Sequence, residues 1–287
     1  MKQLILNADD FGLTRGVNEG IVRAHLEGIL TSTTLMATSR GFDDAVARAK
    51  AAPHLGVGCH LVLVGGTAVS PPAEIPSLVD ADGKLPTTLA GFVAKVSSGA
   101  VRPRDIEREL GAQIEKIRRA GIDPTHLDTH KHTHAHPVVM KALGRVARDA
   151  GITRIRKPAE DLSASWKSQS AGGRSWSRLA SAAAVRAVEP WFRSLAQRYH
   201  LRTPGHFLGL AMTGRLSAAA LCQLIDMLPE GTTEIMLHPG VCDADLARTG
   251  SRLQKQRQLE MEALLAPEAR DAVQSKGVRL ISYRELD

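Results

Sequence analysis

The sequence predicts an α/β fold built as a (β/α) barrel, either regular or distorted. Apolar runs of strand length alternate with segments of helical periodicity, which is typical of βαβ units around a parallel sheet. About eight strands are expected, and eight repeats favour a barrel over an open doubly wound sheet. The first strand is followed by Asn7–Gly12, which lacks the glycine pattern of a dinucleotide-binding turn.

The expected elements follow from local patterns along the chain. Strands are expected at residues 4–6, 33–37, 56–63, 125–129, 153–156, 206–210, 233–237 and 278–282. Helical periodicity covers residues 16–27, 42–51, 105–120, 138–150, 217–228 and 251–265. Gly28 is a suitable C-cap for the first helix, and Pro53 ends the second. The Pro- and Gly-rich stretch from 65 to 86 is expected to be a loop excursion.

We expect a single barrel domain over residues 1–287, with a basic amphipathic helical insertion at residues 157–205. The formal net charge is +7, and the segment 151–202 accounts for all of it with ten basic and three acidic residues. A basic segment on a neutral body argues against a nucleic-acid surface that covers the whole protein. The segment could meet phosphate, anionic lipid headgroups or only water.

Composition places the chain among ordinary globular proteins. Hydrophobic residues make up 43% and charged residues 23%, which excludes general disorder. No stretch approaches ~20 consecutive apolar residues, and the N-terminus reaches acidic residues too early for a secretory signal. Cys59, Cys222 and Cys242 form neither a disulfide framework nor a CxxC motif. We expect a cytoplasmic protein, with attachment to the surface of the inner membrane as an open alternative.

Four sets of chemically active residues fall at or near the ends of expected strands. They are Asp9 with Asp10, His60, His130 and His238. Taken singly, an Asp-Asp pair could be a helix cap or a solvated turn, and a strand histidine could be an ordinary core residue. In a parallel α/β fold, however, the carboxyl ends of the strands carry the active site. The joint placement is therefore a strong signal for a site.

The segment 125–137 holds five of the eleven histidines. If residues 125–129 form a strand, His126, Asp128 and His130 project to one face. One metal cannot use all of these groups, so His132 and the later histidines are expected to line a cleft. A metal-buffering surface tract is the alternative, although the position directly after a strand argues against it.

This residue set suits the hydrolysis of an amide. One carboxylate and two imidazoles make an open metal site with room for water, and such a metal acidifies water and polarises a carbonyl. The second carboxylate can act as the base and a separate histidine as the acid. No GxSxG elbow is present, so covalent catalysis is not expected. Arg154 and Arg156 share strand parity, and one of them could hold Asp9 ionised.

Five motifs resemble the YdjC-type carbohydrate deacetylases, which include chitooligosaccharide deacetylase. The motifs are Asn7–Gly12, Thr31–Thr34, Gly58–Leu61, Thr125–His132 and His238–Gly240. The resemblance implies a (β/α) barrel and one divalent metal ion, zinc or magnesium. It further implies Asp10, His60 and His130 as metal ligands, Asp9 as the base and His238 as the acid. Within that family the chain is similar to deacetylases associated with hopanoid biosynthesis, through the region Pro204–Leu210 and the basic excursion before it.

The predicted activity is removal of acetate from an amino sugar, and the predicted substrate is a hopanoid-linked glycolipid that carries N-acetylglucosamine. Aromatic residues recur at helical spacing among arginines near Trp191 and Phe192, which suits a lipid or membrane surface. We predict substrate-binding roles for His132, Arg156, Trp191 and Phe192. A chitooligosaccharide is the alternative substrate. A phosphoesterase or a non-enzymatic nucleic-acid-binding protein is the alternative class, although no nucleic-acid partner is expected.

Overall fold

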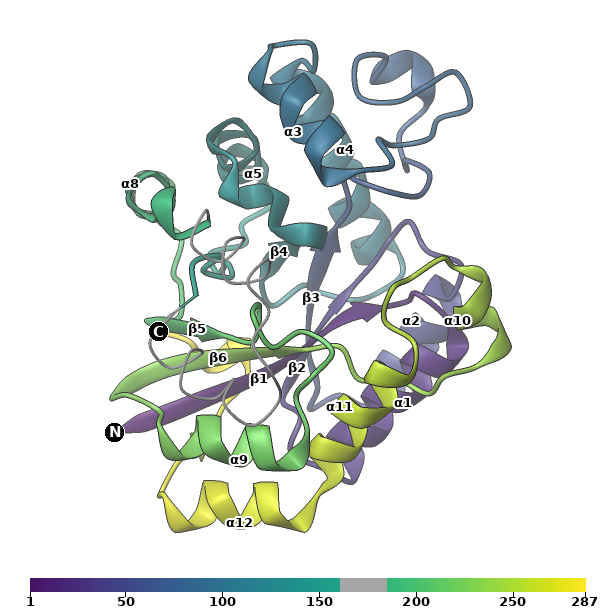
Figure 1. Ribbon diagram of the computed structural model, residues 1–287. Coiled ribbons are helices and arrows are strands. Elements are labelled where there is room, and N and C mark those ends of the chain that lie inside the picture. Colours follow the sequence, from purple (N-terminus) through teal and green to yellow (C-terminus); the bar gives the residue numbers. More distant parts are fainter. Residues whose placement is uncertain (161–184) are drawn as a thin grey trace.

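Parallel strands form one curved sheet at the centre of the computed structural model, which describes residues 1–160 and 185–287 (Figure 1). In the described ranges the sheet has seven strands: β1 (Lys2–Phe11), β2 (Ser32–Leu35), β3 (Gly56–Leu61), β4 (Leu127–Thr129), β5 (His206–Leu208), β6 (Gly231–Leu237) and β7 (Arg279–Leu280). Their order is β4-β3-β2-β1-β6-β5, and β7 pairs with the start of β1. The curved parallel sheet confirms the predicted barrel-like α/β fold.

Helices cover the sheet from several sides. They are α1 (Arg15–Leu26), α2 (Phe42–Ala51), α3 (Leu89–Ser97), α4 (Pro103–Arg119), α5 (Pro137–Asp149), α8 (Glu189–Arg198), α9 (Ala218–Asp226), α10 (Ala244–Arg248), α11 (Lys255–Leu265) and α12 (Pro267–Ser275). In Figure 1, α3, α4 and α5 lie beyond β3 and β4, whereas α2, α10 and α11 pack around α1 on the right of the view. Short 3-10 turns are η1 (Pro72–Glu74), η2 (His130–Ala135) and η4 (Tyr283–Glu285).

The core is built from aliphatic side chains, as the low aromatic content requires. Central strands are buried along almost their whole length, which is typical of parallel strands covered on both faces. Helix α2 has the predicted bounds, and the stretch 65–86 is irregular apart from η1 and an isolated bridge between Thr67 and Lys84. The predictions missed α3, α10 and α12. Helix α3 begins at the cap Thr88, whose side chain accepts a hydrogen bond from the Gly91 amide at 3.1 Å.

The strand expected at residues 153–156 is reduced to isolated bridges. Ile155 pairs with Leu127 of β4, and Arg154 pairs with Arg202, four residues before β5 begins. These bridges continue the sheet from β4 towards β5. Pro158 follows closely and has no amide hydrogen to donate, so the ladder cannot extend there.

The predicted insertion at residues 157–205 is described only in part, because residues 161–184 lie outside the described ranges. The helix expected at residues 175–188 falls mostly outside them. Helix α8 follows the predicted spacing of aromatic residues and packs on α5. Gly144 of α5 lies directly against the ring of Tyr199, and a Cβ at that position would collide with the ring. No helix in the described ranges is long and apolar enough to cross a bilayer.

Candidate active site at the strand ends

Asp10, His60 and His130 converge at the carboxyl ends of β1, β3 and β4. The Oδ1 atom of Asp10 lies 3.5 Å from Nε2 of His60 and 3.4 Å from Nδ1 of His130. The two imidazole nitrogens are 3.3 Å apart. The structure thus brings together the three residues that were predicted as metal ligands, each with one ligand atom turned towards the other two.

The donor set fits a divalent metal ion. Asp10 Oδ1 is buried, and it has no hydrogen-bond partner among the described residues. A buried carboxylate oxygen without a partner is costly, and a cation held between it and the two imidazoles would satisfy it. One carboxylate and two imidazoles also leave coordination positions open for water and substrate. The cluster is therefore a possible metal-binding site.

His60 is oriented from behind by a carboxylate. Its Nδ1 atom lies 2.7 Å from Oδ1 of Asp128 and 3.1 Å from the hydroxyl of Thr34. A hydrogen on Nδ1 leaves Nε2 with a free lone pair directed at Asp10, which is the usual arrangement of a ligating histidine. Burial alone would lower the pKa of His60, but the carboxylates of Asp128 and Asp9 outweigh burial and raise that pKa to about 9.

A bulge at the end of β1 turns two adjacent aspartates towards the same site. Strand alternation would place Asp9 and Asp10 on opposite faces. The register between β1 and β2 shifts between Ala8 and Phe11, and Asp10 has a φ of 67°. A non-glycine residue rarely adopts this left-handed conformation. Such strain is often stored at functional sites, and here it redirects the carboxylate of Asp10.

Arg156, rather than Arg154, binds Asp9. Strand parity alone allowed either arginine. Two guanidinium nitrogens of Arg156 donate to the two carboxylate oxygens of Asp9, at 2.8 and 2.6 Å. Burial alone would raise the pKa of Asp9, but the charge and hydrogen bonds of Arg156 hold that pKa well below its ordinary range. Arg154 instead donates to the backbone oxygen of Leu286. Arg156 is fully buried, so it lies beneath the site.

Arg156 also binds the two other carboxylates beneath the site. Its Nη1 lies 2.6 Å from Oδ2 of Asp128, and its Nε donates to Oε1 of Glu234 at 2.9 Å. Tyr283 donates its hydroxyl to the other oxygen of Glu234 at 2.5 Å. Asp9, His60 and Asp128 could form a second ligand set. However, this set shares His60 with the first, and Arg156 neutralises both of its carboxylates, so the geometry favours one metal over two.

His238 lies at the end of β6, in a largely buried position. Its backbone amide donates to the buried carboxylate of Glu260 at 2.6 Å, and its Nδ1 lies 3.8 Å from the same oxygen. Burial lowers the pKa of His238 to about 4, although the nearby carboxylates of Asp9 and Asp10 act in the opposite direction. Burial raises the pKa of Glu260 to about 7. The imidazole is therefore neutral near pH 7.

The remaining predicted residues surround the loop that carries His130. His132 has a φ of 52°, and its ring meets the edge of Phe207 at a centroid distance of 5.6 Å. Phe192 of α8 is only 4% exposed and packs its ring edge-on against His134 at 6.0 Å. Trp191, the neighbour of Phe192, is 62% exposed. Of this pair, only Trp191 offers an open aromatic surface.

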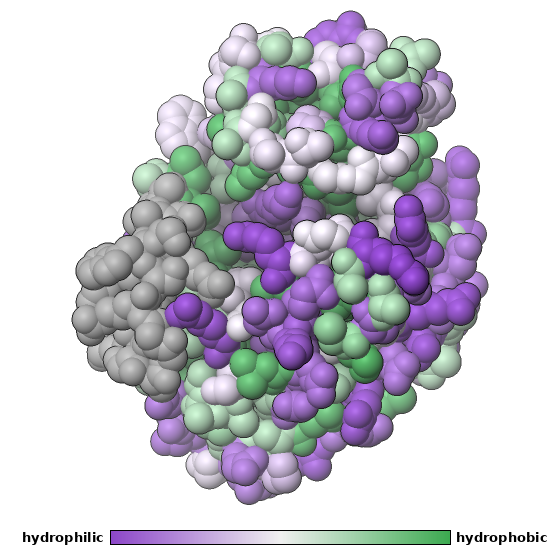
Figure 2. All heavy atoms as spheres, turned by 45° about the vertical axis from the view of Figure 1, so that its right-hand side comes forward, coloured by the Kyte–Doolittle hydropathy of each residue, from purple (hydrophilic) through white to green (hydrophobic). Residues whose placement is uncertain are grey.

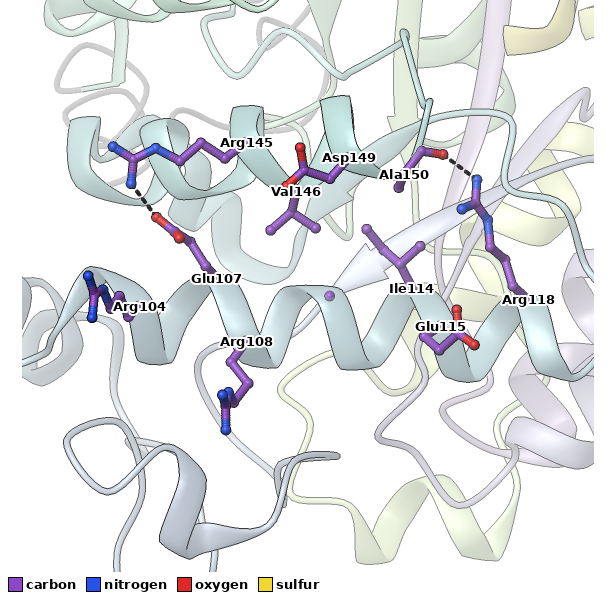
Figure 3. Close-up of a pocket in the computed structure, with 11 residues that line it drawn as sticks. Arg104, Glu107, Arg108, Ile114, Glu115, Arg118, Arg145, Val146, Asp149 and Ala150 are labelled. Atoms are coloured by element: carbon purple, nitrogen blue, oxygen red, sulfur yellow. Dashed lines mark hydrogen bonds and ion pairs between the residues drawn. The ribbon is translucent and has the colours of Figure 1, made fainter.

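A separate groove lies on the outer side of the barrel, between α4 and α5. It has a volume of about 580 Å³ (Figure 3). Arg145 donates to Glu107 across this groove at 2.5 Å, and Arg118 donates to the backbone oxygen of Ala150 at 2.6 Å. None of its lining residues belongs to the cluster at the strand ends. The ion pair of Arg145 and Glu107 spans the groove, and none of the candidate metal ligands lines it, so we assign it no role in the chemistry.

Sequence reasoning missed two charged residues of α11. Arg257 donates from Nη2 to Oδ2 of Asp10 at 2.5 Å, and Glu260 binds the His238 amide as described. The helical stripe that faces the core consists of Arg257, Glu260, Met261 and Leu264. Charged residues at two core positions of one helix stripe are rare unless they are paired. That pattern was visible in the sequence and could have revealed both residues.

The fold and the site define a barrel-like α/β protein with a possible metal centre of one carboxylate and two imidazoles. The chain belongs to the YdjC-like protein family, whose sequence profile matches residues 3–275. It is 35% identical to a carbohydrate deacetylase of Brevibacillus brevis, with 99% of each chain covered. It is also 30% identical to a chitooligosaccharide deacetylase of Proteus mirabilis, over 99% of this chain and 98% of the relative.

A solved structure with the same fold comes from Enterococcus faecalis V583. That protein is named for cellobiose-phosphate cleavage, and it is 29% identical to this chain. The superposition has a TM-score of 0.80 and covers 99% of this chain and 98% of the other. The likeness extends over the whole barrel.

Proposed function

We propose that this protein is a metal-dependent hydrolase that removes the N-acetyl group from an N-acetylated amino sugar. The observation that carries the proposal is the cluster of Asp10, His60 and His130 beside Asp9 and His238. Full-length similarity to proteins named carbohydrate deacetylase, at 35% identity, supports a carbohydrate N-deacetylase.

Asp10, His60 and His130 would hold the metal, which supplies an acidified water and a polarised acetyl carbonyl when it is bound. Asp9 takes a proton from the attacking water. Its Oδ2 accepts one hydrogen bond, from Arg156, and keeps a lone pair for this proton, whereas Oδ1 accepts from both Arg156 and Asn7. His238 protonates the departing amine, so the C–N bond breaks and acetate leaves with the oxygen of the water. Because burial keeps His238 neutral near pH 7, it must receive its proton during the reaction. The proton that leaves the water is the available source.

The direct test is acetate release from a panel of N-acetylated glycans, measured before and after treatment with a chelator. We expect activity that the chelator abolishes and that added zinc or magnesium restores, and the restoring ion identifies the metal. The His60→Ala and His130→Ala variants should lose bound metal and activity together. Wild-type metal content with normal turnover in either variant would remove the site assignment. Absence of acetate release from every glycan of the panel would remove the activity.

For the substrate, we propose a glycolipid that carries N-acetylglucosamine, most simply a hopanoid-linked one, with a chitooligosaccharide as the alternative. Helix α8 supports the glycolipid, because its inner face packs on the turn η2 that begins with His130, while Trp191 remains exposed. An exposed aromatic group on a helix that contacts η2, together with the basic composition of this segment, suits a lipid or a membrane surface. The alternative draws support from the Proteus mirabilis relative. Figure 2 shows one face of the protein, on which hydrophilic side chains are interspersed with groups of apolar ones.

Steady-state kinetics with Trp191→Ser separate the two substrates. Replacing the buried Phe192 would disturb the packing of α8, so only the exposed Trp191 is changed. If the lipid lies along α8, kcat/KM for the glycolipid should fall by about tenfold, the size expected for the loss of a partly buried aromatic contact, while chitobiose should be unaffected. Equal turnover of chitobiose and the glycolipid by the wild type would favour the chitooligosaccharide.

A further inference from the structure

Arg257 of α11 contacts the carboxylate of Asp10 on the side away from the imidazoles. Its Nη2 donates to Oδ2 at 2.5 Å, while Oδ1 of the same carboxylate faces His60 and His130. The guanidinium is 1% exposed, and its Nε donates to the backbone oxygen of Leu253 at 3.3 Å. The two oxygens of Asp10 therefore have different surroundings.

Helix α11 is fixed to the segment that follows β6 at two points. The backbone oxygen of Arg257 accepts a hydrogen bond from the Gly240 amide at 3.1 Å. One turn further along, Glu260 accepts the His238 amide at 2.6 Å and the Gly214 amide at 2.5 Å. The guanidinium thus projects from a helix that cannot easily shift relative to the end of the central strands.

We propose that Arg257 is a positioning residue that holds Asp10 as a ligand through one oxygen. The guanidinium occupies Oδ2, so only Oδ1 is left to face the metal position. Asp10 needs such an anchor because its backbone is in the left-handed conformation at a bulge, where a free carboxylate could turn away. Ligation through one oxygen also preserves the open positions that a hydrolytic metal site requires. This inference rests on the metal site of the proposed function.

The charge of Arg257 makes the positioning role distinguishable from a purely electrostatic one. A guanidinium next to a ligand carboxylate repels a metal cation, so its removal should tighten metal binding if charge alone matters. If the guanidinium instead holds the carboxylate in place, its removal should weaken binding. Loss of a group that orients a metal ligand typically reduces affinity 10–100-fold. The two roles predict opposite signs.

The experiment measures Zn²⁺ affinity by competition with a chromogenic chelator, and the absorption spectrum of the Co²⁺-loaded protein. The variants are Arg257→Gln and Arg257→Lys, with Arg248→Gln, an exposed arginine of α10, as the matched control. We expect about 10–100-fold weaker Zn²⁺ binding in Arg257→Gln, a smaller loss in Arg257→Lys and none in the control. The Co²⁺ spectrum of Arg257→Gln should change, because the carboxylate becomes free to offer both oxygens or neither.

A second measurement places the effect on Asp10 itself. In an Asp10→Ala background, Arg257→Gln should cause no further loss of Zn²⁺ affinity. Unchanged or tighter Zn²⁺ binding in Arg257→Gln would overturn the proposal, as would an equal further loss in the Asp10→Ala background. If Arg257→Gln does not fold, Arg257→Lys decides by the same criteria, and an unchanged affinity and spectrum would overturn the proposal. None of these readouts uses acetate release. A protein that binds Zn²⁺ as described but releases no acetate would therefore contradict the proposed function and leave the role of Arg257 intact.

Discussion

Asp9 and Asp10 are neighbours in the chain, yet the structure ties them to two different regions. Asp9 joins Arg156, Glu234 and Tyr283 beneath the site, a network that we name the floor. Asp10 instead meets Arg257 on helix α11, which together with Glu260 we name the wall. Each aspartate has its own arginine, and the two arginines bind in different ways.

The floor satisfies both oxygens of its aspartate, whereas the wall satisfies only one. Arg156 forms a bidentate pair with Asp9, which favours the ionised form and fixes its orientation. Arg257 leaves Oδ1 of Asp10 without a partner among the described residues. An aspartate held through both oxygens suits a base that stays in place, and an aspartate with one free oxygen suits a metal ligand. The hydrogen bonds thus support the roles that the family resemblance implied.

The largest expected effect separates the two aspartates by metal content. Asp10→Asn should lose most of its bound metal, because the charged carboxylate whose Oδ1 faces the two imidazoles is replaced by a neutral amide. Asp9→Asn should keep its metal while kcat falls by roughly 10²–10⁴, the usual contribution of a general base. His238→Ala should behave like Asp9→Asn. Metal analysis beside steady-state kinetics checks all three variants, and a large loss of metal in Asp9→Asn would reverse the two roles.

The next effect concerns the stability of the floor. Arg156 is the cation between three buried carboxylates, those of Asp9, Asp128 and Glu234. Arg156→Gln leaves them uncompensated, and breaking a buried ion pair in this way typically costs about 3–5 kcal/mol. Denaturant unfolding should show this loss. Arg154→Gln is the matched control, because it removes a single hydrogen bond to a backbone oxygen and should cost about 1 kcal/mol. Equal unfolding free energies for the two variants would contradict the role of Arg156.

The strand-end residues could be predicted because the geometry of parallel sheets is general. The carboxyl ends of parallel strands meet at one edge, so the Asp9–Asp10 pair, His60 and His130 needed only correct strand boundaries to be grouped. Boundaries near His60 and His130 were placed within two residues of those observed for β3 and β4. The chemistry of the donors then indicated a metal. A local pattern and one topological rule were sufficient for this grouping, whereas the choice of Asp10 rather than Asp9 as the ligand came from the family resemblance.

The contacts of the wall depend on features that local patterns do not encode. Strand alternation predicts opposite faces for Asp9 and Asp10, and only the bulge with its left-handed residue brings them together. Arg257 reaches Asp10 across 247 residues of chain, so its partner depends on how α11 packs. Parity limited the arginine of the floor to Arg154 or Arg156, and the tertiary structure selects Arg156. Helix α3 was not among the expected helices, although its cap residue Thr88 stands directly before it in the sequence.

The smallest expected effect concerns the hydrogen bond between Tyr283 and Glu234 at the edge of the floor. It tests whether the groups of the floor are electrostatically coupled. Tyr283 donates to Glu234, and this bond and Arg156 both oppose the burial that raises the pKa of Glu234 to about 7. A buried acid with a raised pKa stabilises the fold fully below its unfolded pKa of ~4.5, and this contribution is lost as the pH rises towards 7. Tyr283→Phe should raise the pKa of Glu234 further, so the loss continues to higher pH.

The cost of Tyr283→Phe should therefore grow with pH. At pH 6 the carboxyl is largely protonated in both proteins, and the variant should lose about 1 kcal/mol for one hydrogen bond. At pH 8 the wild type ionises Glu234 with the help of the tyrosine hydroxyl, so the cost should approach about 2–3 kcal/mol, the value for a hydrogen bond to a charged group. Denaturant unfolding at both pH values measures the difference, and metal content should be unchanged because the wall is not involved. A cost that is independent of pH would show that Tyr283 acts by packing on His126, whose ring it stacks against at 3.6 Å, and that the floor is not electrostatically coupled at its edge.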